Sequence, residues 1–148
     1  MDYRQSFGIS AVGMSYERAR VDVSAMNLAN ANTVREADGK GYQPMRVVAR
    51  SALPNTDFSE LMDNAGVFAL GNAGRNFSIE SIDKPARLVL EPGHPYADAK
   101  GFVSYPAVDS ATEMMTLMSA MRAYEANVAA MNTARNMALK ALEIGGGN

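Results

Sequence analysis

Cysteine and tryptophan are absent from this chain of 148 residues, and histidine occurs once. Without cysteine, neither a disulfide nor a thiolate metal site can form, and the chain is compatible with passage from a reducing to an oxidising compartment. No apolar run reaches the roughly 18 residues that a membrane-spanning helix needs. The first residues also lack the basic and apolar regions of a secretory signal peptide. We therefore expect neither a direct membrane span nor a cleaved signal peptide.

Basic residues are not gathered into a run or a patch. The chain carries 14 Lys and Arg against 16 Asp and Glu, a net charge of −2, which argues against a role in binding nucleic acid. Methionine, by contrast, is abundant, with 11 residues. Because methionine is flexible and fills irregular gaps, this abundance indicates packing surfaces that adapt to several different neighbours.

Apolar residues near the start of the chain are spaced like the seam of a coiled coil. They alternate three and four positions apart, which predicts a helix over residues 6–30. The seam residues are Ile9, Val12, Tyr16, Ala19, Val23 and Met26.

The same spacing returns near the end of the chain and predicts a second helix over residues 111–144. Its seam residues are Met114, Leu117, Met121, Tyr124, Val128 and Met131. Ser110 followed by Glu113 predicts a capping box at the start of this helix. Only six of the 34 residues 111–144 are charged, so the helix is weakly polar all round. Such a helix is typically buried on more than one side. We expect neighbours beyond the first helix, the alternative being a core helix of a larger monomer.

Residues 38–108 differ in character from both predicted helices. All six prolines lie there, and short apolar runs are separated by Pro, Gly, Asn and Asp, as turns require. The expected strands are residues 45–53, 67–70, 77–82, 87–91 and 102–105. We predict an α+β chain whose long N- and C-terminal helices pair as a coiled coil, with a small β-rich domain inserted between them. Residues 1–37 and 109–148 then form one discontinuous domain, and residues 38–108 form the middle domain.

No segment has the residue pattern of an enzyme site. Residues 66–73 have the glycine spacing of a phosphate-binding loop but lack its lysine and hydroxyl residue. His94 stands alone in a proline-rich turn, whereas a metal site needs three or four ligands. Two acid pairs of the kind that glycosidases use lie in polar segments without an evident apolar cleft: Glu60 with Asp63, and Glu80 with Asp83. We expect no catalytic, cofactor-binding or metal site.

Three asparagines close the first predicted helix, in the stretch SAMNLANANT at residues 24–33. Asparagine tolerates the conformations that end a helix, but one would be enough for that. Asn27 and Asn30 lie three positions apart and share a helix face, where their amides offer both donors and acceptors. The pattern is at least as compatible with register-setting contacts, within the chain or between chains, as with a plain helix stop.

SAMNLANANT, close after an amphipathic helix, resembles the signature of the bacterial flagellar axial proteins, the family of rod and hook subunits. In that family a Gly-Tyr loop follows the asparagine turn, as Gly41-Tyr42 does here. Two further segments narrow the resemblance to the proximal rod proteins of the family. They are LEPGHPYADAKGFVSYPAV at residues 90–108 and RAYEAN at residues 122–127. The resemblance covers nearly the whole chain and is weakest over residues 51–76.

The resemblance implies a non-enzymatic building block that assembles helically into the drive shaft of the basal body. It implies terminal helices that line the export channel, torque transmission, a need for the subunit in motility, and a location in the periplasm after flagellar type III export. The implied partners are copies of the chain, neighbouring proximal rod proteins, the distal rod, and the protein that joins the rod to the export gate and MS ring. The rival interpretations are another axial protein of the family, a soluble coiled-coil adaptor, and a small peptidoglycan hydrolase.

The seams and the asparagines together define the assembly interface that we expect. Contacts that run head to tail without closing generate a helical tube, and neighbours offset the entropy of ordering a chain that folds on assembly. Under our hypothesis the asparagines both stop the first helix and anchor it to an adjacent subunit. The expected interface residues are Ile9, Val12, Tyr16, Val23, Met26, Asn27, Asn30, Asn32, Met114, Leu117, Met121, Tyr124, Asn127, Val128, Met131 and Leu142.

Overall fold

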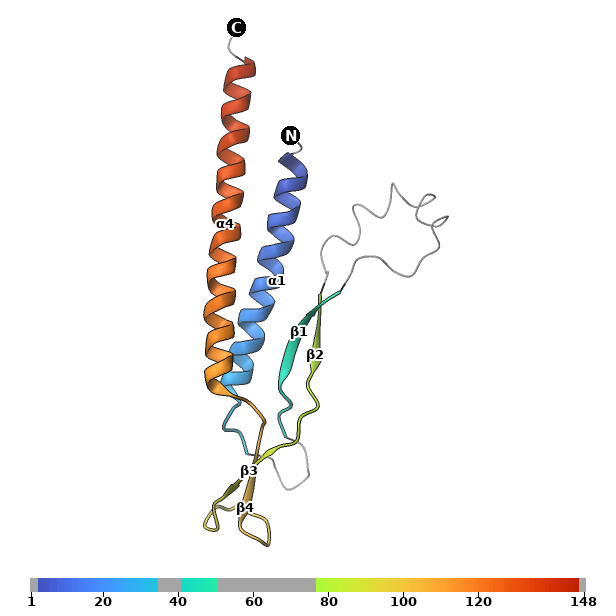
Figure 1. Ribbon diagram of the computed structural model, residues 1–148, viewed down its shortest axis with the longest axis vertical. Coiled ribbons are helices and arrows are strands. Elements are labelled where there is room, and N and C mark those ends of the chain that lie inside the picture. Colours follow the sequence, from blue (N-terminus) through green and yellow to red (C-terminus); the bar gives the residue numbers. More distant parts are fainter. Residues whose placement is uncertain (1–2, 35–40, 51–76, 147–148) are drawn as a thin grey trace, which may run out of the picture. The chain divides into compact units, whose positions relative to one another are not determined.

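The computed structural model describes residues 3–34, 41–50 and 77–146 of the chain (Figure 1). In chain order its elements are α1 (Tyr3–Ala29), β1 (Met45–Ala49), β2 (Phe77–Ser81), β3 (Arg87–Leu90), β4 (Phe102–Tyr105) and α4 (Ser110–Gly146). Two long terminal helices that pack together, with short strands between them, confirm the predicted α+β class. The strand expected at residues 67–70 lies outside the described residues.

The chain divides into two compact units, and each contains parts of both helices. The Gly13 unit comprises Met1–Ala19, Val48–Ser78 and Ala120–Asn148, and the Asn27 unit comprises Arg20–Val47 and Ile79–Ser119. This division reflects compactness, whereas the domain boundaries expected from the sequence follow the change from helix to strand. Those boundaries stay a prediction.

Asparagine ends α1, as its position in the sequence predicts. The Asn30 side-chain amide donates a hydrogen bond of 2.8 Å to the carbonyl of Met26, and the Asn30 backbone N–H donates to the same oxygen. The Thr33 hydroxyl in turn donates to the Asn30 carbonyl. The last turn of a helix leaves carbonyls without intrahelical partners, and Asn30 supplies the partners of the Met26 carbonyl. The helix-stop half of the hypothesis is therefore confirmed for Asn30.

The start of α4 differs from the expected capping box. Asp109, not Ser110, is the N-cap: its carboxylate accepts hydrogen bonds from the Ala111 backbone N–H at 3.1 Å and from the Thr112 hydroxyl at 2.6 Å. The Thr112 hydroxyl, followed by the Ala111 N–H, holds the pKa of Asp109 below its ordinary value of 3.8. The prediction failed because the sequence offers two adjacent capping residues and because Glu113 is used elsewhere.

Small residues, rather than the large residues of the predicted seam, make the buried stripe of α4. Ala120 and Ala134 are 0% and 8% exposed. In the Gly13 unit a methyl group built on Gly13 of α1 would lie 2.9 Å from the Asn127 amide nitrogen, so the Asn127 side chain packs directly against the α1 backbone there. The correction has a physical reason: short side chains allow close helix approach, and larger ones such as Met121 are turned outward.

The strands form two separate two-stranded sheets, β1 with β2 and β3 with β4. The β3–β4 pair is antiparallel, with Val89 opposite Val103 and Leu90 opposite Phe102. Val103 is fully buried, whereas Leu88 and Leu90 on the other face of the hairpin are 63% and 60% exposed. In the Asn27 unit, the Ile82 N–H donates to the Pro44 carbonyl at 2.7 Å and extends the β1–β2 pairing by one bond.

Candidate functional site

Asn27, near the end of α1, uses every hydrogen-bonding position of its side chain. Its carbonyl oxygen accepts hydrogen bonds from the Tyr42 hydroxyl at 2.7 Å and from the Met45 backbone N–H at 2.9 Å. Its amide nitrogen donates to the Met45 carbonyl at 2.8 Å and to the Glu113 carboxylate at 3.0 Å. Asn27 is 0% exposed. We call these four residues, Asn27, Tyr42, Met45 and Glu113, the amide clasp.

The amide clasp joins three segments that are distant in sequence. Asn27 is 18 residues from Met45 and 86 residues from Glu113, so it ties the end of α1 to the start of β1 and to the first turn of α4. A primary amide has two donors and an acceptor oxygen with two lone pairs, and all four positions are used here. Since an unmet buried polar group costs about 1–3 kcal/mol, a fully bonded amide is a stabilising buried group.

The clasp perturbs the pKa of Tyr42. Partial burial, followed by the negative charge of Glu113, raises its pKa above the ordinary value of 10.0. Its neutral hydroxyl is therefore the donor to Asn27 throughout the physiological pH range.

Exposed apolar side chains gather on α4 to an extent unusual for a surface helix. Nine large apolar residues of this one helix are at least 38% exposed, and Ile144 reaches 84%. They are Met114, Met115, Met118, Met121, Tyr124, Met137, Leu139, Leu142 and Ile144. Large exposed apolar surface marks interaction sites, and at about 100° per residue these side chains lie around more than half of the helix circumference rather than along one narrow stripe. We call this set the apolar face of α4.

The expected interface residues divide by exposure. Four members of the apolar face belong to the expected set, Met114, Met121, Tyr124 and Leu142, and on α1 Ile9 is 67% and Met26 42% exposed. Asn32 is exposed too. The half-buried members are Val12, Tyr16, Asn30, Leu117, Asn127, Val128 and Met131.

Three of the expected interface residues are held by contacts within the chain. Asn27 is covered completely by the amide clasp, and Val23, four residues earlier on α1, is 3% exposed. Tyr16 packs edge-to-face on Phe77, with ring centroids 5.8 Å apart. Asn27 therefore anchors α1 to segments of its own chain. Whether the other asparagines contact an adjacent subunit stays a prediction.

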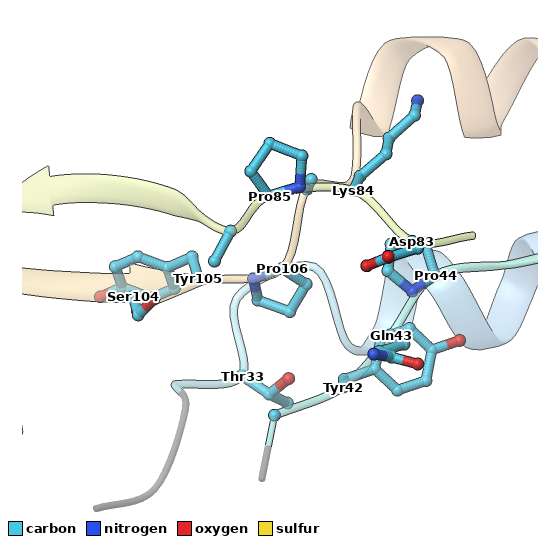
Figure 2. Close-up of a pocket in the computed structure, with 13 residues that line it drawn as sticks. Thr33, Tyr42, Gln43, Pro44, Asp83, Lys84, Pro85, Ser104, Tyr105 and Pro106 are labelled. Carbon is cyan, nitrogen blue, oxygen red and sulfur yellow. The ribbon is translucent and has the colours of Figure 1, made fainter. Parts of the chain in front are cut away.

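A pocket in the Asn27 unit has a volume of about 480 Å³. Figure 2 shows Pro44, Pro85 and Pro106 among its lining residues, together with Tyr42 and Tyr105. Its one acidic lining residue is Asp83, which is exposed. A hydrolase of the glycosidase type needs two carboxyl groups across its cleft, and this pocket does not supply them.

The proline-rich turn around His94 is the loop of the β3–β4 hairpin. His94 Nδ1 accepts a hydrogen bond from the Tyr96 N–H at 3.2 Å, and the Asp98 carboxylate accepts from the Lys100 and Phe102 N–H groups. The bond from Phe102, followed by that from Lys100, lowers the pKa of Asp98. Gly101 has φ of +83°, which L side chains rarely adopt. Within residues 3–34, 41–50 and 77–146, no three His, Asp or Glu side chains gather as a metal site would require.

The sequence singled out Asn27 but missed its partners. The spacing of Asn27 and Asn30 identifies a polar helix face, but the 86-residue separation from Glu113 leaves no local signal. Gly41-Tyr42 after the asparagine turn is recognisable as a motif in the sequence. Only the structure shows that the Tyr42 hydroxyl donates a hydrogen bond to Asn27. None of the described helices is long and apolar enough to cross a membrane.

Comparisons with known proteins agree on one family. Residues 99–144 match the family model described as "Flagellar basal body rod FlgEFG protein C-terminal". The chain is 38% identical over 145 residues to the flagellar basal-body rod protein FlgC of Bacillus subtilis (strain 168), covering 95% of this chain and 96% of that protein. It is 40% identical over 140 residues to FlgC of Escherichia coli O6:H1, with coverages of 94% and 95%. It is 39% identical over 139 residues to FlgC of Salmonella typhimurium, with the same coverages.

Proposed function

This chain belongs to the FlgC family of flagellar basal-body rod proteins, and we propose that it assembles into the rod through the apolar face of α4. As a member of this family it is a structural subunit of the flagellar basal-body rod and associates with other rod components. The observation that supports the proposed surface is the exposure of nine large apolar side chains on one helix, all of them within the matched segment 99–144.

The composition of α4 suits contacts with several non-equivalent neighbours. Methionine adapts its shape to different surroundings, and five of the nine exposed residues are methionine. Burial of apolar surface contributes about 25 cal/mol for each Å² removed from water. We propose that copies of this chain and other rod proteins cover this face in head-to-tail contacts that generate a helical tube.

The finer assignments rest on the same premise. We propose that the subunit has no enzymatic role, that it lies in the periplasmic rod, and that it travels there by flagellar type III export. We propose that its partners are the neighbouring proximal rod proteins, the distal rod, and the protein that joins the rod to the export gate and MS ring. Support for a non-enzymatic role comes from the relatives, whose names describe basal-body rod proteins.

Substitution on the apolar face tests the proposed surface directly. Met115 is 69% and Leu142 71% exposed, so Met115→Glu and Leu142→Glu should leave the free energy of unfolding of the isolated chain within about 0.5 kcal/mol. In a motile bacterium that carries the chain in place of its own FlgC, both variants should abolish swimming and reduce the number of basal bodies recovered. Met115→Leu, which keeps the apolar surface, is the matched control and should swim normally. Normal rod assembly with both glutamates would refute the proposed surface.

Limited proteolysis of the purified chain separates a rod subunit from the rival adaptor. If α4 depends on neighbours for burial, protease should cut its C-terminal turns well before the amide clasp region. Circular dichroism should show a broad loss of helix on heating that precedes the cooperative unfolding of the amide clasp region. A fully protease-resistant chain that melts in one cooperative step would favour the soluble coiled-coil adaptor.

A further inference from the structure

The first turn of α4 carries both a ligand of the amide clasp and the beginning of the apolar face. We propose that Asn27 is a positioning residue for assembly. This inference rests on the proposed function. The hydrogen bonds from Asn27 to Met45 and Glu113 must form before the methionines that follow Glu113 can contact neighbouring subunits. Asn27 itself, being fully covered, touches no partner in this role.

The geometry of the clasp requires an amide at position 27. The amide nitrogen donates to two acceptors, the Met45 carbonyl and the Glu113 carboxylate, while the amide oxygen accepts from two donors, the Met45 N–H and the Tyr42 hydroxyl. Asn27 bonds both the N–H and the carbonyl of Met45, and so takes the place that a neighbouring strand would have on this edge of β1. An aspartate in this place has the acceptors but no donor, and its charge would face the Glu113 carboxylate at about the 3.0 Å now occupied by a hydrogen bond.

The clasp bears on the apolar face because of where Glu113 stands. Met114 and Met115 follow it directly and Met118 lies just over one turn further along the helix, and these three side chains are 54%, 69% and 54% exposed. The Asp109 cap is local to the first turn, so it starts the helix without orienting it. The Asn27–Glu113 bond is a direct polar contact between this turn and α1.

Opening of the clasp is unfavourable because four polar groups lose their partners together. Removing the donor function of Asn27 should lower the ratio of closed to open clasp about tenfold to a hundredfold, the range for an unmet buried polar group. The Met45 amide proton reports this ratio directly, since its acceptor is the Asn27 side-chain oxygen. Hydrogen exchange at Met45 therefore measures closure in the intact chain.

The test is a polarity swap between positions 27 and 113. Asn27→Asp should accelerate exchange at Met45 by about tenfold to a hundredfold. Glu113→Gln alone should change it little, because a glutamine oxygen still accepts from Asn27. In the double variant Asn27→Asp/Glu113→Gln, the new glutamine donates to the new aspartate, so the exchange rate should return part of the way to that of the unchanged chain. Recovery is partial because the Met45 carbonyl, to which Asn27 also donates, stays without a donor. Asn32→Asp, at an exposed position, is the matched control and should leave Met45 protected.

The same four variants are then scored for basal bodies in the motile strain. Loss with Asn27→Asp and recovery with the double variant, parallel to Met45 protection, supports the proposal. A merely space-filling role predicts no loss with either single variant, because both substitutions preserve side-chain size. Additive effects, normal assembly with an open clasp, or an unprotected Met45 in the unchanged chain would each overturn the inference. Met115→Glu, which leaves Met45 protected, tests the assembly surface separately, so failure of the clasp proposal is distinguishable from failure of the proposed function.

Discussion

The Asn27 unit and the Gly13 unit hold parts of the same two helices by different means. In the Asn27 unit the contact is a buried amide with all its hydrogen bonds made. In the Gly13 unit it is the absence of a side chain, which lets the Asn127 amide approach the α1 backbone. The difference is one of specificity. A buried hydrogen-bond network fixes one register, whereas close packing of small residues sets a distance and leaves register less restricted.

Removal of the Asn27 amide should have the largest effect on the isolated chain. Asn27→Ala leaves the Met45 N–H and carbonyl and the Glu113 carboxylate without their partner, and should lower the free energy of unfolding by about 3 kcal/mol. Asn30→Ala is the matched control, because Asn30 bonds the Met26 carbonyl at a partly exposed helix end, and should lose under about 1 kcal/mol. Urea denaturation measures both. Equal losses would mean that the clasp adds nothing beyond a helix stop.

Steric filling of the close approach should have the next largest effect. Gly13→Leu would drive a side chain into Asn127 and should destabilise the helix pair by about 2 kcal/mol, the range for overpacking. Gly8 lies on the same helix with nothing within 4 Å of a built methyl group. Gly8→Ala should therefore stabilise the chain by about 0.5–1 kcal/mol through helix propensity alone. Thermal unfolding of both variants checks the pair, and destabilisation by Gly8→Ala would contradict it.

The sequence predicted the parts of the fold that depend on local pattern. The two helices follow from apolar spacing, and all four described strands fall within expected ranges. The stop at Asn30 follows from the chemistry of asparagine. These features are determined by residues within one or two turns of each other, and the signal for them is therefore present in a short window.

The parts that the sequence did not predict depend on choices between neighbours or on distant partners. Asp109 and Ser110 are both good caps, and only the structure shows that Asp109 is used. The apolar spacing predicts a seam of large residues on α4, whereas in the structure Ala120 is buried and Met114 is exposed. A periodic pattern identifies an apolar stripe on a helix. It does not distinguish residues that are buried within the chain from residues that a neighbouring subunit would bury. In an assembling protein, the larger side chains can face outward.

Loss of the helix cap should have a smaller effect that depends on pH. Asp109→Ala removes the acceptor of the Ala111 N–H and the Thr112 hydroxyl, and should lower the melting temperature at neutral pH, whereas Ser110→Ala should not. The folded-state pKa of Asp109 is below 3.8. Its contribution is therefore present above about pH 3.8 and lost as pH falls through the folded value. The melting temperatures of Asp109→Ala and the unchanged chain should converge in acid. A larger effect from Ser110→Ala than from Asp109→Ala would show that Ser110 caps the helix, as the capping box predicts.

Deletion of the Tyr42 hydroxyl should have the smallest effect and the opposite pH dependence. Tyr42→Phe removes one hydrogen bond to Asn27 and should cost about 1 kcal/mol. Because the pKa of Tyr42 is raised above 10.0 in the folded chain, its contribution is complete below pH 10 and lost as pH rises through the folded value. The difference between Tyr42→Phe and the unchanged chain should therefore be flat through neutral pH and shrink in alkali. In an Asn27→Ala background the same substitution should change nothing. A full Tyr42→Phe effect in that background would show that Tyr42 acts outside the clasp and that the contrast between the two units rests on Asn27, Met45 and Glu113 alone.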